Sequence, residues 1–107
     1  MPHYLVQGRY TPEGWAALVK NPHDRTEAVR PVIERLGGRY EQGYFTDDLG
    51  AIVAVCEFPD DRVMAQLAAA VRASSQVAEL RCTRLISTAE AVELFQQAGA
   101  VDYQAPA

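Results

Sequence analysis

The chain has 107 residues, of which 49% are hydrophobic and 22% charged, with a net charge of −4 at pH 7 and a pI near 5.0. This length suits one globular domain over residues 1–107, and the composition excludes disordered and collagen-like chains. The acidic balance and the scattered basic residues argue against binding to nucleic acid or to anionic membranes, since both need basic patches.

Membrane, export and metal signals are missing from the sequence. The longest apolar stretch, Ala65–Val71, is interrupted by Gln66 and is far shorter than the roughly 20 residues that span a bilayer. Met1–Tyr4 lacks the basic and apolar regions of a signal peptide. Cys56 and Cys82 form no CxxC motif and no Cys/His cluster, which fits a reducing compartment. We therefore expect a cytoplasmic protein without a metal site or a cofactor.

The first predicted element is a strand over His3–Tyr10, whose residues alternate between two faces. Thr11 and Pro12 then have the chemistry of a helix cap and first helical residue. This helix is expected to be short, because Asn21–Asp24 repeats the same cap-and-proline signal. A second helix, or a kinked continuation of the first, follows to Leu36.

The second helix combines an apolar face with an internal proline. Its apolar residues recur at three- and four-residue spacing: Ala28, Val29, Val32, Ile33 and Leu36. Pro31 removes one backbone hydrogen bond, so a kink or a break is expected there. Gly37 and Gly38 end the helix, because glycine tolerates the left-handed conformation common at helix ends.

Two further strands form a predicted hairpin. Arg39–Thr46 is the second strand, and Asp47–Gly50 has the composition of a hairpin loop. Ala51–Phe58 is the most apolar segment of the chain, which predicts a central strand buried on both faces.

The last third of the chain predicts a helix, a strand and a final helix. Pro59–Asp61 caps a helix that runs to about Ala73, and Gln76–Ile86 is the fourth strand. Ser87–Glu90 is a capping box that opens the final helix, which ends at Gly99. This helix is expected to pack through its apolar residues, Val92, Leu94 and Phe95.

This order of elements predicts an α+β, ferredoxin-like βαββαβ fold with a four-stranded antiparallel sheet in the order 4-1-3-2 and helices on one face. Right-handed crossovers place the first and third strands side by side, and we expect that pair to be parallel. The core spans about residues 2–90, and a C-terminal helix and tail follow over residues 87–107.

The other face of the sheet carries apolar and aromatic groups that helices do not cover. We expect a second copy of the chain to cover it, in a homodimer or higher homo-oligomer. Cys56 and Cys82 lie on the third and fourth strands, two strand spacings or about 9.6 Å apart. That exceeds the reach of a disulfide, so both thiols are predicted to be free.

Five segments carry a likeness to a known family: Tyr4–Gly14, Asn21–Arg25, Leu36–Gly38, Tyr44–Thr46 and Glu57–Asp61. Through them the chain resembles the GYD-domain family of small bacterial proteins, over roughly residues 2 to 90. It departs at the name-giving glycine-tyrosine-aspartate before the third strand, where it has Asp-Leu-Gly-Ala over residues 48–51. The resemblance implies a ferredoxin-like, dimeric α+β-barrel-type fold and little about activity. Similar folds include cofactor-independent monooxygenases, polyketide cyclases and chlorite-dismutase-like haem proteins.

The candidates for lining a ligand pocket are Arg9, Tyr10, Trp15, His23, Arg25, Tyr40 and Tyr44. His23 lies at a helix start and suits acid–base chemistry, although an exposed first-turn position is the commoner role. His3 begins the first strand and is expected to be a surface residue. Two isolated histidines without carboxylate partners predict no metal site.

The two candidate arginines each have two interpretations. Arg9 either binds an anion or forms an ion pair with Glu41, Glu57 or Glu79. Arg25, near a helix start, either holds an anionic ligand or forms a surface salt bridge.

The aromatic candidates either fill the core or wall a pocket for a flat organic molecule. Tyr44 is the preferred pocket residue among them, because its hydroxyl is suited to orienting a ligand oxygen.

Three functions remain open from the sequence. The first is a non-catalytic domain that binds a small organic ligand or a partner protein. The second is a cofactor-independent monooxygenase or polyketide-cyclase-like enzyme acting on an aromatic substrate, with Tyr44, His23 and Arg9 positioning and polarising it. The third is a purely structural oligomer. An enclosed pocket of about 300 Å³ or more favours the first two, and a packed interior favours the third.

Overall fold

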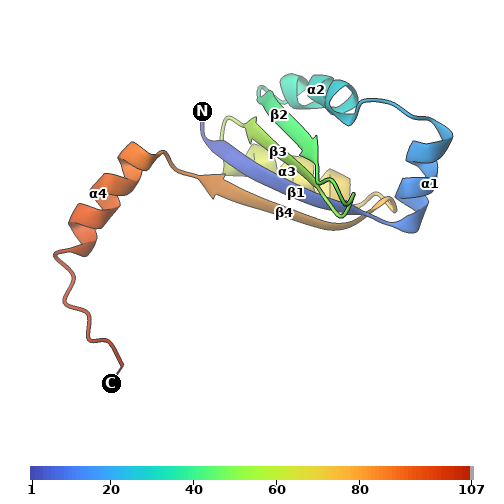
Figure 1. Ribbon diagram of the computed structural model, residues 1–107. Helices are drawn as coiled ribbons and strands as arrows, with labels where there is room; N and C mark the ends of the chain where they lie inside the picture. The colour runs from blue at the N-terminus through green and yellow to red at the C-terminus, as the bar shows by residue number, and fades with distance from the viewer. Residues whose placement is uncertain (107) are drawn as a thin grey trace.

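A four-stranded sheet in the order β2-β3-β1-β4 forms the centre of the computed structural model, which describes residues 1–106. The strands are β1 (His3–Tyr10), β2 (Arg39–Phe45), β3 (Ile52–Glu57) and β4 (Val77–Leu85). The helices are α1 (Pro12–Lys20), α2 (Arg25–Arg35), α3 (Asp61–Arg72) and α4 (Thr88–Ala98) (Figure 1). The fold class and the strand order agree with the prediction.

The direction of one strand pair differs from the prediction. β1 and β3 are neighbours, but they run antiparallel, with Tyr4 opposite Cys56 and Gly8 opposite Ile52. The expected parallel pairing is therefore wrong. The crossover through α1 and α2 leads from β1 to β2, which lies beyond β3. The β2–β3 hairpin then reverses the chain, so β3 enters between the two strands in the opposite direction.

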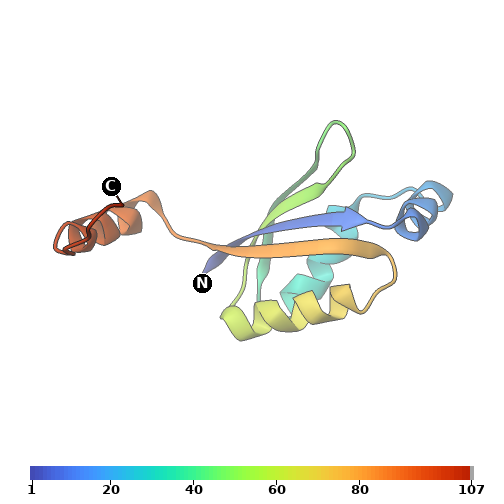
Figure 2. The ribbon, with the colours of Figure 1, turned by 90° about the horizontal axis from the view of Figure 1, so that it is seen from below.

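Helices α2 and α3 cover one face of the sheet, and α1 lies at one end of it (Figure 2). The predicted caps are present: Thr11 Oγ1 accepts a hydrogen bond from Gly14 N at 3.1 Å, and Asp60 accepts one from Val63 N at 2.9 Å. Pro31 lies inside α2 and does not break the helix. Gly37 follows α2 with φ of 82°, the left-handed conformation predicted for the helix end.

The core lies between the sheet and these two helices. Its buried cluster consists of Tyr4, Ile33, Tyr40, Ala54, Cys56 and Phe58. Phe58 is 0% exposed, and its ring meets that of Tyr4 edge-on at 5.6 Å. Only the helix-facing residues of β3 are fully buried, so the expectation that both of its faces are buried is wrong. Both cysteines are free thiols, as predicted.

Helix α4 stands apart from the rest of the molecule (Figures 1 and 2). Its capping box is formed as predicted, but the expected packing through Val92, Leu94 and Phe95 is wrong. These side chains are exposed, Phe95 by 71%, and α4 contains no buried residue. Only Ile86 and Ser87 separate β4 from α4, and the helix leads away from the sheet instead of back onto it.

The projecting helix makes the molecule long. It measures 57 × 37 × 25 Å, and its radius of gyration is 17.3 Å, against about 13 Å for a compact domain of this length. No helix in residues 1–106 is both long and apolar enough to cross a membrane.

Candidate ligand cavity

A partly open cavity of about 140 Å³ lies between the sheet and helices α2 and α3. Its walls are mainly aliphatic, with contributions from Val6, Val29, Ile33, Ile52, Ala54, Leu67, Val71, Val77 and Leu80. The strands supply alternate residues, because only every second side chain of a strand faces the helices. Gly8 and Ala54, on neighbouring strands, have little or no side chain, and this leaves space above the sheet.

Few polar groups reach the cavity. Burial raises the pKa of the Cys56 thiol to about 12, and burial also raises the pKa of Tyr40 above its usual value. Both groups are therefore protonated and uncharged near neutral pH. The Tyr40 hydroxyl accepts a hydrogen bond from Thr26 at 3.3 Å. The lining residues include neither a carboxylate nor a histidine.

Arg25 is a charged residue of the cavity lining, and a hydrogen bond to a neighbouring histidine fixes its side chain. It begins α2, and its Nη1 lies 2.9 Å from Nε2 of His23. His23 Nδ1 lies 2.8 Å from the carbonyl oxygen of Asn21. A carbonyl only accepts, so Nδ1 carries the proton and Nε2 accepts from the guanidinium. His23 thereby positions Arg25 and has no free lone pair to act as a base.

One donor of Arg25 is unused. Its Nε is buried and has no hydrogen-bond partner among the described residues. An unpaired buried donor costs about 1–3 kcal/mol, and more for a charged group. Arg25 thus contributes a guanidinium to the cavity lining, while its Nε stays buried within the protein.

A second cavity, of about 270 Å³, shares Tyr10 and Arg25 with the first. It lies between α1 and the chain entering α2, and its lining adds Lys20 and His23. The aliphatic interior is therefore adjoined by a region with basic side chains.

The predicted pocket residues divide between several places. Arg9, Tyr10, Arg25 and Tyr40 line the main cavity, and His23 lies beside Arg25. The Trp15 ring packs against Tyr10 at 5.5 Å and against Phe45 at 6.0 Å, outside that lining.

Tyr44 lies away from the main cavity, and Arg9, which lines it, also pairs with a carboxylate. The Arg9 side chain pairs with Glu79 at 4.0 Å, one of the three carboxylates predicted for it. Tyr44 is 62% exposed and pairs in register with Val53, on the sheet face without helices. None of the cavities described within residues 1–106 is lined by both Tyr44 and His23. The set proposed for catalysis, Tyr44, His23 and Arg9, is thus not gathered at one cavity.

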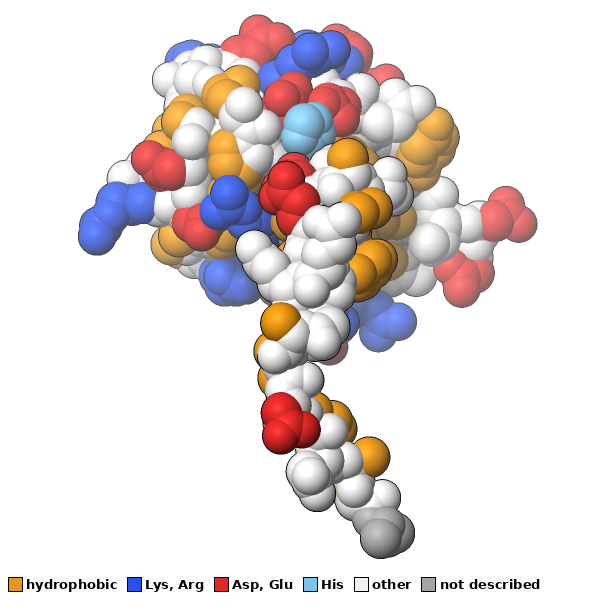
Figure 3. Space-filling view, turned by 90° about the vertical axis from the view of Figure 1, so that its left-hand side faces the viewer, with side chains coloured by type: hydrophobic (Ala, Val, Ile, Leu, Met, Phe, Trp, Pro, Cys, Tyr) orange, Lys and Arg blue, Asp and Glu red, His pale blue; other side chains and the backbone are white. Residues whose placement is uncertain are grey.

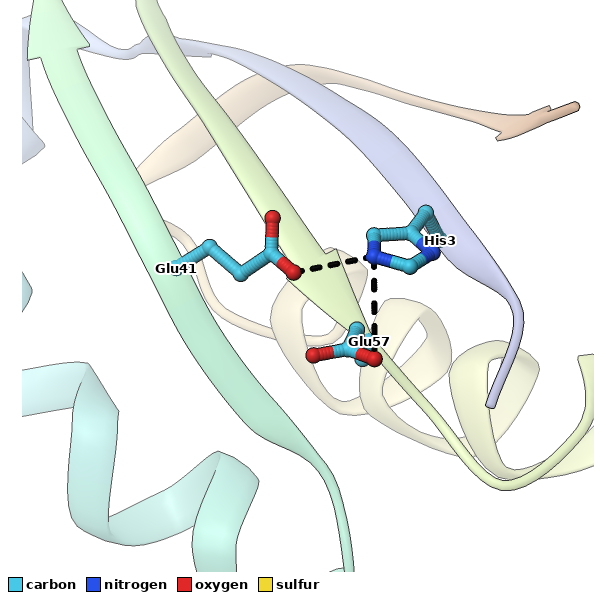
Figure 4. A group of neighbouring side chains, drawn as sticks. All are labelled: His3, Glu41 and Glu57. Carbon is cyan, nitrogen blue, oxygen red and sulfur yellow. Dashed lines mark ion pairs between the residues drawn. The ribbon is translucent and has the colours of Figure 1, made fainter. Parts of the chain in front are cut away.

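The sheet face that helices leave open carries an unforeseen cluster of His3, Glu41 and Glu57, from three neighbouring strands (Figure 4). His3 Nε2 lies 2.9 Å from Glu41 and 3.6 Å from Glu57. His3 is therefore not isolated from carboxylates, contrary to expectation. These donor types can bind zinc or iron. Arg39 lies 3.8 Å from Glu57, so the carboxylates of this cluster already have partners among the side chains around them.

The cluster could not be predicted from the sequence, because its three residues meet only through the order and register of the strands. Glu41 follows the inward-facing Tyr40 and so lies on the open face, and the pairing of β1, β3 and β2 places it beside His3. The register shift between Tyr40 and Gln42 changes the facing of the residues that follow and puts Tyr44 on this face opposite Val53. Nothing in the spacing of residues 3, 41 and 57 reveals that juxtaposition.

Comparison with known families adds one finding. The sequence model of the GYD domain matches residues 4–95, from β1 into α4. The chain belongs to the GYD domain family. The GYD domain therefore includes the whole sheet, the cavity and the first turns of the projecting helix. A search of curated proteins finds no match to the chain.

Proposed function

We propose that this GYD domain is a homodimeric binding protein whose internal cavity takes a small carboxylic acid with an aromatic or short branched apolar group. The observation that carries this proposal is the aliphatic cavity with the cationic side chain of Arg25 in its lining. The apolar group would lie between the sheet and α2, and the carboxylate would accept hydrogen bonds from Arg25.

The size of the cavity sets the size of the ligand. An engineered apolar cavity of about 150 Å³ in another protein takes up a molecule of the size of benzene. At about 140 Å³ this cavity suits a single ring or a short acyl chain. It is smaller than the 300 Å³ or more that a drug-sized ligand needs, so polycyclic polyketides fit it poorly.

The charge at the cavity sets the chemistry of the ligand. A guanidinium binds a carboxylate through charge-assisted hydrogen bonds, which are about twice as strong as neutral ones. Lys20 in the adjoining cavity adds a second positive charge on the same side. A neutral molecule of equal size would form only the weaker, neutral type of hydrogen bond with the Arg25 guanidinium and bind more weakly.

The same residues support binding over acid–base catalysis. A cofactor-independent oxygenase or cyclase needs a group that takes a proton from its substrate. The cavity lining contains a protonated thiol, phenols and arginine. The unprotonated nitrogen of His23 already accepts a hydrogen bond from Arg25 and is not free to take a proton from a substrate.

Pairing of two copies is supported by the open sheet face. Leu5, Val53 and Val55 lie at its centre and are only half-buried in one chain. The polar side chains around them are paired with each other, as in His3–Glu41 and Arg9–Glu79. Prior pairing lowers the cost of removing these charges from water when a second copy covers the face.

Isothermal titration calorimetry with phenylacetate tests the binding proposal. We expect phenylacetate to bind and its neutral counterpart phenylacetamide to bind about 10- to 100-fold more weakly, as a charged hydrogen bond of about 1.5–3 kcal/mol implies. Arg25→Gln should weaken phenylacetate by the same factor and leave phenylacetamide almost unchanged.

Two further variants make the test specific. Arg35→Gln removes an exposed arginine of the same helix, away from the cavity, and should bind like the natural protein. Ala54→Leu fills the cavity and should abolish binding of both compounds while circular dichroism shows a folded domain. Undetectable binding of phenylacetate, benzoate and isovalerate, or full binding by Ala54→Leu, would rule the proposal out.

A further inference from the structure

The arm, which we define as residues 87–106, has no packing partner in its own subunit. Every side chain of α4 is exposed except Ala91, which is partly covered. Figure 3 shows the arm standing clear of the body. An isolated helix of 11 residues is marginal in water even with good helix formers, since packing supplies most helical stability in proteins. The arm therefore needs a surface to pack against.

Helix α4 has a distinct apolar side. At helical spacing, one side gathers Ala91, Val92, Leu94, Phe95 and Ala98, and the opposite side gathers Glu90, Glu93, Gln96 and Gln97. Leu94 and Phe95 are 51% and 71% exposed. This amphipathic pattern is typical of a helix that lies on an apolar surface.

A suitable surface lies at the root of the same arm. An open groove of about 450 Å³ is lined there by Met1, Leu85 and Ile86, large apolar side chains that are all exposed. Arg84 and His3 also line it. Leu85 pairs in register with His3, so the groove is continuous with the open sheet face.

We propose that two copies exchange arms, each α4 packing its apolar side into the root groove of the other copy. A two-fold axis makes such a contact self-complementary, because arm and groove belong to the same chain and both are satisfied at once. Within one chain only the first turn of the arm, through Ser87 and Glu90, reaches the groove. The rest of α4 leads outward, because only Ile86 and Ser87 separate it from β4.

Apolar packing, and not charge, favours this occupant. The polar groups of the groove are already engaged within one copy: Arg84 lies 3.3 Å from Asp61, and His3 lies 2.9 Å from Glu41. The arm carries Glu90, Glu93 and Asp102, and Glu90 itself lines the groove. The exposed apolar side chains of the groove, Met1, Leu85 and Ile86, are what the apolar side of α4 matches. The inference rests on the homodimer of the proposed function and is independent of ligand binding.

Sedimentation equilibrium of full-length variants gives the first test. Phe95→Glu places a charge on the apolar side of α4, and we expect it to weaken dimerisation at least about 100-fold. Gln96→Glu introduces the same charge on the polar side of the same helix and should change dimerisation less than about threefold. Phe95→Ala, which adds no charge, should weaken it in the same direction.

Nuclear magnetic resonance of mixed dimers gives the second test. One copy carries ¹³C and the other does not, so filtered spectra show only contacts between copies. We expect contacts from the Phe95 ring of one copy to the Leu85 and Ile86 methyl groups of the other.

The outcomes separate the two proposals. A dimer that lacks these contacts and tolerates Phe95→Glu as well as Gln96→Glu overturns arm exchange and leaves pairing through the sheet standing. A monomer at every concentration overturns both arm exchange and the homodimer. An arm that packs only on another protein or a vesicle overturns arm exchange alone. The calorimetric test of ligand binding is unaffected by either result.

Discussion

The molecule has two parts, the body (residues 1–86) and the arm (residues 87–106). Helices in both parts begin with the same kind of capping residue, but the body buries apolar side chains and the arm does not. Helix α3 of the body begins at Asp60, and helix α4 of the arm begins at the Ser87 capping box. Yet α3 packs on the sheet through Val63, Met64 and Leu67, and α4 buries nothing. Caps decide where a helix starts, and they do not decide whether it has anything to pack against.

The contrast extends to what each region contributes to stability. The body has a closed core and can hold its shape alone, whereas the arm has only its backbone hydrogen bonds and caps. Removing an apolar group from the body should therefore lower the free energy of unfolding of a single chain. Removing one from the arm should lower only the affinity between chains.

The largest expected effect compares two phenylalanines. Phe58→Ala empties the centre of the core, where Phe58 is 0% exposed and contacts Tyr4, and should cost about 3–5 kcal/mol of unfolding free energy. Phe95→Ala should cost less than about 0.5 kcal/mol in the monomer, because its side chain meets only water there. Urea unfolding at a concentration where the protein is monomeric measures both. Equal losses would mean that the arm packs within its own subunit.

An intermediate effect compares two glycines. A Cβ at Gly38 would overlap the backbone carbonyl oxygen of Glu57 and crowd Ile33, so Gly38→Ala should cost about 1–3 kcal/mol. A Cβ at Gly99 would meet nothing closer than 3.4 Å, and Gly99 has helical φ of −62°. Gly99→Ala should therefore leave the unfolding of the body unchanged and raise helix content by extending α4. Thermal unfolding followed by circular dichroism reports both, and a Gly38→Ala protein of natural stability would contradict the close packing of β2 on β3.

The features of the fold that the sequence predicts correctly are those that depend on neighbouring residues, such as helix caps and turns. Thr11, Asp60 and Ser87 cap their helices as expected, and Gly37 takes the left-handed conformation expected at the end of α2. These features depend on residues a few positions apart. The relative direction of β1 and β3 and the isolation of α4 depend on where whole elements go in space, and both predictions failed.

The candidate site was also predictable only in part: local patterns indicate some of its residues but not its volume. Tyr10, Arg25 and Tyr40 were predicted as pocket residues and line the cavity. The void itself depends on small residues, Gly8 and Ala54, lying beneath helices that do not fill the space above them. Sequence periodicity identifies which residues face inward, and it does not measure the volume left between them. The His3–Glu41 contact depends on the order and register of three strands, which no local pattern marks.

The smallest expected effect compares the two caps directly. Asp60 accepts a hydrogen bond from Val63 N at 2.9 Å, and Ser87 accepts one from Glu90 N at 3.0 Å, so the caps are chemically alike. Asp60→Ala should lower the unfolding free energy of the body by about 1 kcal/mol, because α3 is part of the cooperative unit. Ser87→Ala removes a similar local energy from a helix with no other support. In the monomer it should leave the urea midpoint unchanged and lower the helical signal at 222 nm.

If the arms are exchanged, Ser87→Ala should affect stability at protein concentrations where the dimer forms, although it does not do so in the monomer. In a dimer, α4 becomes part of the cooperative unit, so the cost of Ser87→Ala appears as weaker association, by about fivefold for a loss of 1 kcal/mol. Asp60→Ala should show the same cost at every concentration, since α3 is packed within each subunit. A Ser87→Ala protein that loses stability at all concentrations equally would place α4 in the fold of its own chain, and the difference between body and arm would then be one of degree.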